Sequence, residues 1–304
     1  MSAAEVTLLV PCHNAAGFLP RFRECVDRSD PAFHRILCYD DGSTDGTAVI
    51  ARKLGFEVSE GTVNRGVAFA RNQLAALANS EWIHFHDADD LISPDYLSRI
   101  SPLLRDGVDV VSCDADWISE GDRDLIMAWR YDPRALHETP VPYLLHTPMS
   151  LNNTIIRRSA WMRIGGCDER LKMWEDADVH FRLARAGFHF RHVPEVLTWS
   201  LRRPSSFSHD YRASWRSRLL SLEGYAEQDA VGLNKDELAT AAENAALSLA
   251  HLKDKEAACR AIALARRLGR SPPSSSQLGV RLLKRILPAY TLMQWQARRR
   301  NRTA

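Results

Sequence analysis

Three carboxylates within four residues are the side chains of this sequence best suited to do chemistry. Glu81–His86 alternates large apolar and polar side chains, as a half-buried strand does, and Asp87, Asp89 and Asp90 follow directly. On an extended segment Asp87 and Asp89 would leave the same face and could bind one hard cation or one polar ligand. For the cluster taken alone, a solvated loop is the favoured alternative, so the other motifs decide between the two.

The elements before this cluster place two more polar clusters at strand ends. The apolar run Val6–Val10 predicts a strand buried on both faces, and Pro11–Asn14 follows it. Ile36–Tyr39 predicts a second strand, which runs into Asp40–Asp45. Strands alternate with helical patterns, so we predict an α/β fold with a mostly parallel sheet flanked by helices. Ligands bind outside the carboxyl ends of such strands, where the three clusters would meet.

Further elements follow from the same patterns. The predicted helices are Phe18–Val26, Ala48–Leu54 and Val67–Ala78, and further strands are predicted at Phe56–Val58, Val108–Cys113, Asn152–Arg157 and Phe188–Val193. Glu175, Asp176 and Asp178 open a helix that ends at Gly187. Acidic side chains cap a helix N-terminus and interact with its dipole, which is the structural explanation of this last cluster.

Composition sets the broad class. The chain has 304 residues, 45% hydrophobic and 26% charged, enough for one large domain or a large and a small one. It contains no Gly-x-Gly-x-x-Gly after the first strand and no Gly-x-x-x-x-Gly-Lys-Ser/Thr, which disfavours dinucleotide oxidoreductases and P-loop NTPases. No apolar run approaches the ~18 residues of a spanning helix, and no signal-peptide pattern opens the sequence, so we expect a cytoplasmic protein. The six scattered cysteines predict reduced core residues.

Six motifs together resemble the GT-A-fold glycosyltransferases of family two. They are Val-Pro-Cys-His-Asn at 10–14, Asp-Asp-Gly-Ser-Thr-Asp-Gly-Thr at 40–47, Asn-Arg-Gly-Val-Ala-Phe-Ala-Arg-Asn at 64–72, His-Asp-Ala-Asp-Asp at 86–90, Gly-Gly-Cys-Asp at 165–168 and Glu-Asp-Ala-Asp at 175–178. All occur in the family's order over residues 5–208. The resemblance implies a Rossmann-like GT-A sheet and a nucleotide-sugar donor.

The resemblance also implies donor-binding roles. Asp40 and Asp41 would help hold the nucleotide, and Asp87 would lie at its ribose. The other matched residues assigned to the donor are Pro11, Asn14, Asn64, Gly66 and Arg71. Arg71 would add positive charge at the diphosphate, and a surface position on the predicted helix Val67–Ala78 is the alternative. A second Asp-x-Asp, Asp114 and Asp116, is interpreted as structural or acceptor-facing.

Metal and catalytic roles are implied in the same way. Asp89 would hold Mn²⁺ or Mg²⁺ at the diphosphate, because a hard cation offsets the negative charge that develops on this leaving group. Asp176 would be the general base, with Glu175 shaping its surroundings. The segment 201–208 resembles the family's Arg-Arg-His-Pro-x-Ser but lacks the histidine before the proline, so His209 would be a metal ligand only in a shifted register.

The leading hypothesis is therefore an inverting, metal-dependent glycosyltransferase of polysaccharide or cell-envelope biosynthesis. A UDP-sugar is the favoured donor, and a hydroxyl of a glycan or lipid-linked molecule is the acceptor. The alternatives are a sugar-1-phosphate nucleotidyltransferase, disfavoured because no Gly-rich basic loop follows the first strand, and a non-catalytic nucleotide-sugar-binding protein. No nucleic-acid partner is expected.

The C-terminal region differs from the rest in charge. Residues 257–304 contain eleven Lys or Arg and no Asp or Glu, which leaves 29 basic and 38 acidic residues in 1–256. We predict a catalytic domain at 1–212, a helical extension at 213–270, and a linker with a basic amphipathic segment at 271–304. Basic and apolar residues interleave over 280–302, which favours a peripheral contact with an anionic membrane surface. Packing of this segment on the acidic body is the alternative.

Overall fold

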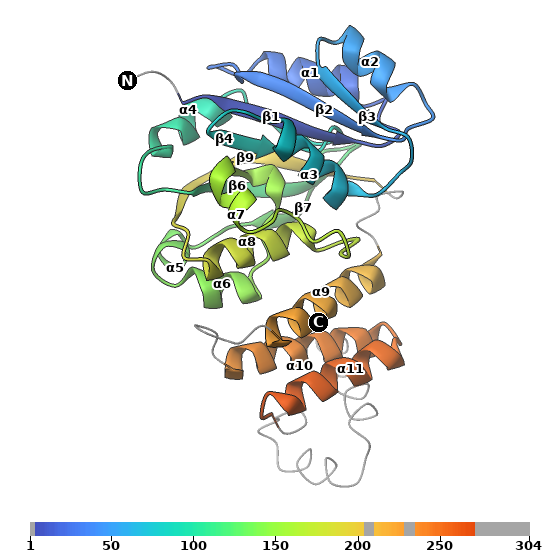
Figure 1. Cartoon of the computed structure of the whole chain (residues 1–304), viewed down its shortest axis with the longest axis vertical. Coiled ribbons are helices and arrows are strands. Elements are labelled where there is room, and N and C mark those ends of the chain that lie inside the picture. The colour runs from blue at the N-terminus through green and yellow to red at the C-terminus, as the bar shows by residue number, and fades with distance from the viewer. Residues whose placement is uncertain (1–3, 204–209, 228–234, 271–304) are drawn as a thin grey trace. The chain divides into compact units, whose positions relative to one another are not determined.

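The computed structural model describes residues 4–203, 210–227 and 235–270. The chain divides into two compact units. The described residues of unit 1 fall within Met1–Arg170 and Glu175–Ser206, and those of unit 2 fall within Leu171–Trp174 and Phe207–Ala304. Within the described residues, unit 1 contains one nine-stranded sheet with helices on both faces, and unit 2 contains three helices (Figure 1). The α/β class predicted from alternating strands and helices is confirmed.

Four parallel strands form the first half of the sheet. In spatial order they are β3 (Glu57–Gly61), β2 (Arg35–Asp41), β1 (Val6–Cys12) and β4 (Trp82–Phe85). In the register, Leu9 of β1 lies opposite both Leu37 and Phe85, and β1 is buried apart from the partly exposed Pro11. A strand with neighbours on both sides and helices on both faces needs the continuous apolar run seen in the sequence.

The second half of the sheet is mixed. It continues with β8 (Thr154–Arg157), β6 (Val110–Ser119), β9 (Phe190–Arg202) and β5 (Leu91–Ile92), and β7 (Leu125–Trp129) pairs with β6 outside this order. β8 is antiparallel to β4 and β6, whereas β6 and β9 are parallel. β9 is much longer than the predicted Phe188–Val193, because its pairing with β6 resumes after a register shift near Cys113.

Two groups of helices cover the two faces of the sheet. The first group consists of α1 (Leu19–Asp27), α2 (Thr47–Lys53) and α4 (Tyr96–Ile100). The second group consists of α3 (Val67–Leu77), α5 (Pro133–Glu138), α6 (Pro140–His146), α7 (Arg158–Arg163) and α8 (Glu175–Arg185). Short 3₁₀ turns occupy Ser101–Leu103 and Leu151–Asn153. The second group matters most for the site, because α3 and α8 carry its charged residues.

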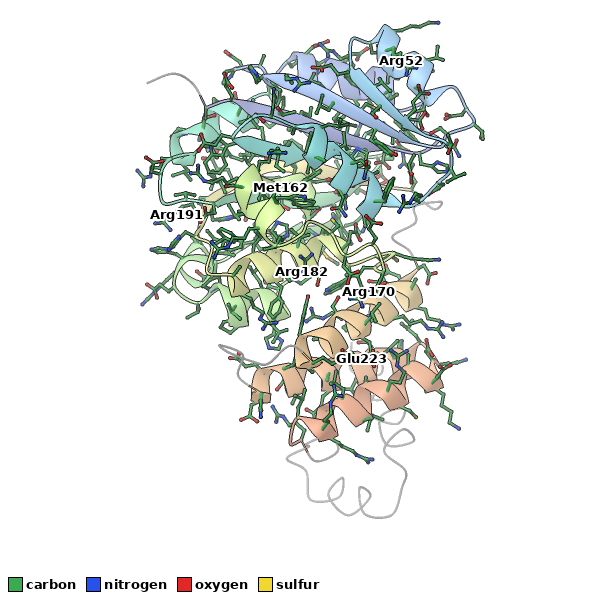
Figure 2. All side chains as sticks on the ribbon, viewed as in Figure 1. Arg52, Met162, Arg170, Arg182, Arg191 and Glu223 are labelled. Atoms are coloured by element: carbon green, nitrogen blue, oxygen red, sulfur yellow. The ribbon has the colours of Figure 1, made fainter. Side chains whose placement is uncertain are left out.

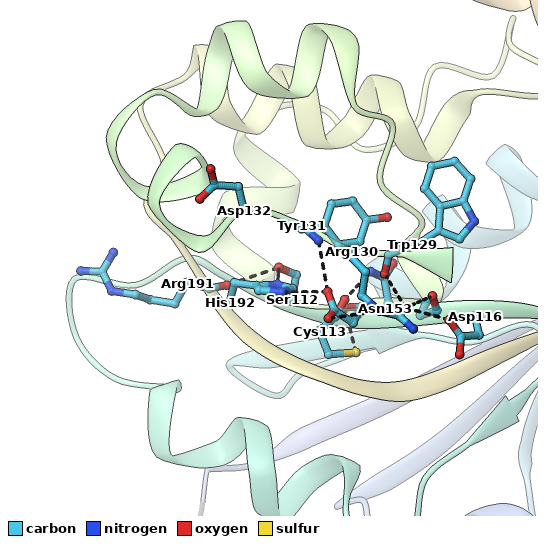
Figure 3. A network of polar contacts seen from close by, with 12 residues as sticks. Ser112, Cys113, Asp116, Trp129, Arg130, Tyr131, Asp132, Asn153, Arg191 and His192 are labelled. Carbon is cyan, nitrogen blue, oxygen red and sulfur yellow. Dashed lines mark hydrogen bonds and ion pairs between the residues drawn. The ribbon is translucent and has the colours of Figure 1, made fainter. Parts of the chain in front are cut away.

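A buried polar cluster supports the register shift between β6 and β9 (Figure 3). His192 contacts Ser112 Oγ through Nδ1 at 2.9 Å and Asp114 Oδ1 through Nε2 at 3.1 Å. The Tyr131 amide donates to the same Asp114 oxygen at 3.1 Å, and Arg130 pairs with Asp116 at 2.7 Å. The order Ser–His–Asp resembles a hydrolase triad, but Ser112 is fully buried and cannot reach a substrate. We therefore assign Ser112, His192 and Asp114 a structural role.

Unit 2 contains α9 (Tyr211–Glu227), α10 (Lys235–His251) and α11 (Lys255–Arg267). The buried faces of α10 and α11 are mostly alanine, so their backbones can approach closely. Asp254 begins α11 by accepting from the Ala257 amide at 3.3 Å, and Arg216 of α9 pairs with its other oxygen at 2.5 Å. In the described ranges, no helix has the length and apolar character needed to cross a bilayer.

Candidate active site

The acidic cluster after β4 forms a turn, which corrects the extended segment assumed from the sequence. β4 ends at Phe85, and the Asp90 amide donates to the Asp87 carbonyl at 3.1 Å. The two-residue spacing therefore does not by itself place Asp87 and Asp89 on one face. Burial, and next the charge of Asp87, raise the pKa of Asp89.

Asp90 is a buried structural carboxylate that attaches this turn to its neighbours. It accepts from Asn152 Nδ2 at 2.6 Å, Ser200 Oγ at 2.8 Å and the Leu201 amide at 2.8 Å. Asn152 Oδ1 in turn accepts from the Asp87 amide at 3.2 Å. Burial raises the pKa of Asp90 well above its usual range. Asn152 lies in the turn Leu151–Asn153 rather than in the predicted strand Asn152–Arg157, and a single asparagine carries no sequence signal of such a role.

Arg71 joins the acidic turn to helix α8. Its side chain is 4% exposed, so the surface alternative for this arginine is wrong. One nitrogen pairs with Asp87 Oδ1 at 3.0 Å and another with Glu175 Oε1 at 2.5 Å. Burial alone lowers the pKa of Arg71, but the two carboxylates outweigh burial and raise it, so the guanidinium stays charged. One buried cation thus holds together carboxylates that are far apart in the sequence.

Asp176 lies beside this ion-paired group, in the first turn of α8. It is only partly buried as a residue, but burial of its carboxyl group and the charge of Glu175 raise its pKa to about 7. The Ala177 amide donates to Asp176 Oδ1 at 2.7 Å. His180 Nδ1 contacts the Asp176 carbonyl at 2.7 Å and fixes this turn from within the core. A carboxylate that titrates near neutrality suits a general base.

Arg182, in the last turn of α8 (Figure 2), connects this helix to the Gly165-Gly166 segment. Arg182 donates to the Asp178 carboxylate at 2.7 Å, to the Ile164 carbonyl at 2.8 Å and to the Gly166 carbonyl at 2.6 Å. Trp174, immediately before the helix, has a φ of 70°, a left-handed conformation that bulky residues rarely adopt. Strained backbone next to Asp176 is consistent with a functional site.

Asp41 and Asn64 shape the loop that leads into α3. The Asp41 carboxylate accepts from the Arg65 amide at 2.9 Å and from the Gly66 amide at 2.7 Å. Asn64 Oδ1 accepts from the same Gly66 amide at 2.9 Å, and Gly66 has a φ of 99° that favours glycine. These residues therefore determine where α3, and with it Arg71, begins.

Asn14 and Asp40 connect the loops after β1 and β2. Asn14 Oδ1 accepts from the Thr44 backbone amide at 3.0 Å, and the backbone amide of Asn14 donates to Ser43 Oγ at 2.8 Å. Asp40 Oδ1 accepts from the Ser43 amide at 3.0 Å. Pro11 lies near the end of β1 at the same edge of the sheet. Pro11 and Asp40, near the ends of β1 and β2, and Asn14, just after β1, thus lie at adjoining strand ends, as the parallel strands require.

Asp89 has an ion-pair partner that the sequence pattern does not predict. Arg203 pairs with Asp89 Oδ2, and Arg21 donates to the Asp89 carbonyl at 3.0 Å. In the described part of the chain, no group of three His, Cys, Asp or Glu side chains could hold a metal ion. A cation at Asp89 would therefore complete its shell with water and phosphate oxygens, as Mg²⁺ and Mn²⁺ readily do. His209, the other proposed ligand, lies outside the described residues.

A sheet with a parallel first half, a mixed second half and an acidic turn at their junction defines a protein of the GT-A class. The chain belongs to glycosyl transferase family 2, because residues 7–168 match the model described as "Glycosyl transferase family 2". Both the family and the GT-A fold expected from the six motifs are confirmed.

Relatives and solved structures agree with this assignment. The succinoglycan biosynthesis protein ExoA of Rhizobium meliloti (strain 1021) is 27% identical over 212 residues, which are 62% of this chain and 62% of ExoA. A mannosyltransferase of Pyrobaculum calidifontis, solved with GDP-Man and Mn²⁺, superposes with a TM-score of 0.61 at 17% identity, covering 98% of this chain and 85% of the other. TarS residues 1–349 of S. aureus, solved with UDP-GlcNAc, gives a TM-score of 0.57 at 16% identity, covering 87% and 90%. These two likenesses concern the fold.

Proposed function

We propose that this protein transfers a sugar from a nucleoside-diphosphate donor to a hydroxyl of a glycan or lipid-linked acceptor, with inversion at the anomeric carbon. A UDP-sugar is the favoured donor. One observation carries the proposal: buried Arg71 joins Asp87, on the donor side, to Glu175, and Asp176 follows Glu175 with a pKa of about 7. A group that titrates near neutrality thus adjoins the expected donor site.

The donor residues act in two ways in this proposal. Asp87 binds the ribose with the carboxylate oxygen that Arg71 does not occupy, because a carboxylate can accept several hydrogen bonds. Asp41 acts mainly through the loop at 64–66, whose amides occupy its oxygens. Asp40, Asn14 and Pro11, at or just after the ends of β1 and β2, complete the nucleotide side.

Asp89 is the residue proposed to hold the divalent cation, Mn²⁺ or Mg²⁺. When bound, this cation supplies Lewis-acid stabilisation of the negative charge on the departing diphosphate. Arg71 acts by holding Asp87 in place, because its guanidinium is buried and already pairs with the carboxylates of Asp87 and Glu175. The cation at Asp89 would therefore carry most of the stabilisation of the leaving group.

Asp176 is the proposed general base. Its carboxylate takes the proton of the acceptor hydroxyl while the hydroxyl oxygen attacks the anomeric carbon from the side opposite the leaving group. One displacement at that carbon inverts its configuration. Glu175, held by Arg71 at 2.5 Å, keeps a neighbouring negative charge that raises the pKa of Asp176. Because that pKa lies near neutrality, the base is both available and strong enough to act.

A panel of nucleotide sugars tests the proposal. A ligand that binds only the folded protein raises its melting temperature by mass action, so at least one UDP- or GDP-sugar should do so when Mn²⁺ is present. The same donor should then be hydrolysed slowly, with release of the nucleoside diphosphate. If no nucleotide sugar changes the melting temperature and none is hydrolysed, the proposed function is wrong.

The catalytic domain is proposed to span residues 1–212, and a cytoplasmic location is proposed with it. The basic segment at 280–302, which lies outside the described residues, is proposed to contact the cytoplasmic face of an anionic membrane. That contact would bring the site close to a lipid-linked acceptor.

A further inference from the structure

Arg203 places a cation of the protein itself on the proposed metal ligand. It directly follows β9, and its side chain is 15% exposed. Its Nη2 pairs with Asp89 Oδ2, and its Nη1 lies 3.5 Å from Glu120 Oε1. The guanidinium carbon lies 4.3 Å from the centre of the Phe18 ring. An aromatic face and a second carboxylate thus support the arginine beside Asp89.

Arg21 closes this arrangement into a small network. Its Nη1 pairs with Glu120 Oε1 at 3.0 Å, and its Nη2 donates to the Asp89 carbonyl at 3.0 Å. Two arginines therefore face the two carboxylates of Asp89 and Glu120, so their charges balance. A carboxylate already paired in this way attracts a divalent cation less strongly than an unpaired one.

We propose that Arg203 is an internal counter-cation of Asp89, which competes with the divalent metal and turns to the diphosphate of the donor when the metal binds. This inference rests on the proposed function, because it needs Asp89 as the metal ligand. Arg203 and a metal ion at Asp89 both carry positive charge, so each weakens the binding of the other to this carboxylate. The diphosphate brings negative charge, and the planar guanidinium matches its oxygens in bidentate fashion.

Competition between Arg203 and the metal ion makes the metal and the nucleoside diphosphate bind cooperatively. A metal ion alone must displace Arg203 without offering this arginine a new partner, so its binding is weak. A metal ion together with a nucleoside diphosphate offers that partner, so both bind more tightly. Glu120 and the Phe18 ring keep the released side chain close to the site.

If Arg203 only positions Asp89, its removal should change the metal affinity in the opposite direction. If Arg203 only orients Asp89 for the metal, its removal should lower metal affinity by about 10- to 100-fold, as the loss of such supporting groups does. If Arg203 competes with the metal, its removal should raise metal affinity. The affinity for Mn²⁺ alone therefore separates the two roles.

The experiment uses the full chain and two titrations. Mn²⁺ alone is titrated and its free concentration is followed by electron paramagnetic resonance, and UDP and GDP are then titrated by calorimetry at saturating Mn²⁺. In Arg203→Gln the affinity for Mn²⁺ alone should rise about tenfold, and the affinity for the nucleoside diphosphate that binds should fall about tenfold, which is the effect of one charged hydrogen-bond partner. Arg203→Lys keeps the charge and should bind Mn²⁺ alone like the wild type.

Arg202→Gln is the matched control. The guanidinium carbon of Arg202 lies 3.4 Å from the centre of the Trp117 ring. This substitution removes a positive charge at the preceding position. The affinities for Mn²⁺ alone and for the nucleoside diphosphate should both stay at the wild-type values. Circular dichroism confirms that each variant is folded.

Arg203→Gln with unchanged or lower affinity for Mn²⁺ alone overturns the inference. Asp89→Asn separates this failure from a failure of the proposed function. If Asp89→Asn loses Mn²⁺ binding while Arg203→Gln shows no higher affinity for Mn²⁺, only the counter-cation role of Arg203 is wrong. If Asp89→Asn binds Mn²⁺ like the wild type, the metal assignment and the inference fall together.

Discussion

Asp176 combines a position next to an ion-paired carboxylate with a pKa of about 7. A general base works only when deprotonated, so the transfer rate should rise as pH increases through about 7 and level off above it. Asp176→Asn cannot accept the proton and should lose about 10²- to 10⁴-fold in turnover while still binding donor. Turnover measured from pH 5 to 9 tests both statements. Full activity in Asp176→Asn would reassign the base, with Glu175 and Asp178 as the next candidates.

The stability of Asp176→Asn shows whether this residue serves structure instead. Its pKa is higher in the folded chain than in an unfolded one, so the folded state binds the proton more tightly. The resulting contribution to stability is present below the ordinary carboxyl pKa and is lost as pH rises through about 7. At pH 8 Asp176→Asn should therefore unfold at no lower urea concentration than the wild type. A clearly lower midpoint would indicate that the ionised carboxylate supports the fold.

Arg71 is expected to have the largest effect on stability among the site residues. Arg71→Met would leave the carboxylates of Asp87 and Glu175 close together without their shared cation. Breaking a buried ion pair from one side typically costs about 3 to 5 kcal/mol of unfolding free energy. Arg65→Met is the control, since Arg65 is 53% exposed and its ion pair with Glu169 should contribute less than about 1 kcal/mol. Equal urea midpoints for the two variants would contradict the role of Arg71.

The elements of the first half of the sheet could be predicted from the sequence, and those of the second half only in part. β1 and β2 each contain a short, mainly apolar run (Val6–Val10 and Ile36–Tyr39) that leads into turn residues, a pattern that predicts a buried strand. β9 could not be predicted at its full length, because its second part depends on the register shift against β6. The burial of Arg71 was also hidden, since an arginine on a helix is usually exposed and its partners lie in other elements.

The loop at 64–66 should depend on the carboxylate of Asp41, which accepts from the Arg65 and Gly66 amides. In Asp41→Ala these amides lose a charged acceptor, a loss of about 1.5 to 3 kcal/mol for such a hydrogen bond, so the start of α3 should loosen. Nucleotide binding should weaken with and without Mn²⁺, and hydrogen exchange at the Gly66 amide should accelerate. Asp45→Ala is the control, because Asp45 accepts from the Ala16 and Thr47 amides instead. Slow exchange at Gly66 in Asp41→Ala would refute this account.

Over the whole molecule, charge is distributed more unevenly than the net value of +2 indicates. The six motifs all fall in the first 178 residues, whereas residues 257–304 contain eleven basic residues and no acidic one. The sequence therefore separates the residues proposed for chemistry from those proposed for attachment. Neither the sugar nor the acceptor could be predicted, because the matched motifs concern the donor and the reaction rather than the group that receives the sugar.

The basic C-terminal segment should bind anionic membranes. Apolar residues interleave with its basic ones from Val280 to Trp295, and each basic residue near such a surface contributes about 1 kcal/mol. The full chain should therefore sediment with vesicles that contain phosphatidylglycerol but not with vesicles of phosphatidylcholine alone, and salt should weaken the binding. A chain truncated after Ser276 should stay in the supernatant. If the full and truncated chains sediment equally poorly at low salt, the segment instead packs on the acidic body or on another subunit, and removing it should then lower the melting temperature.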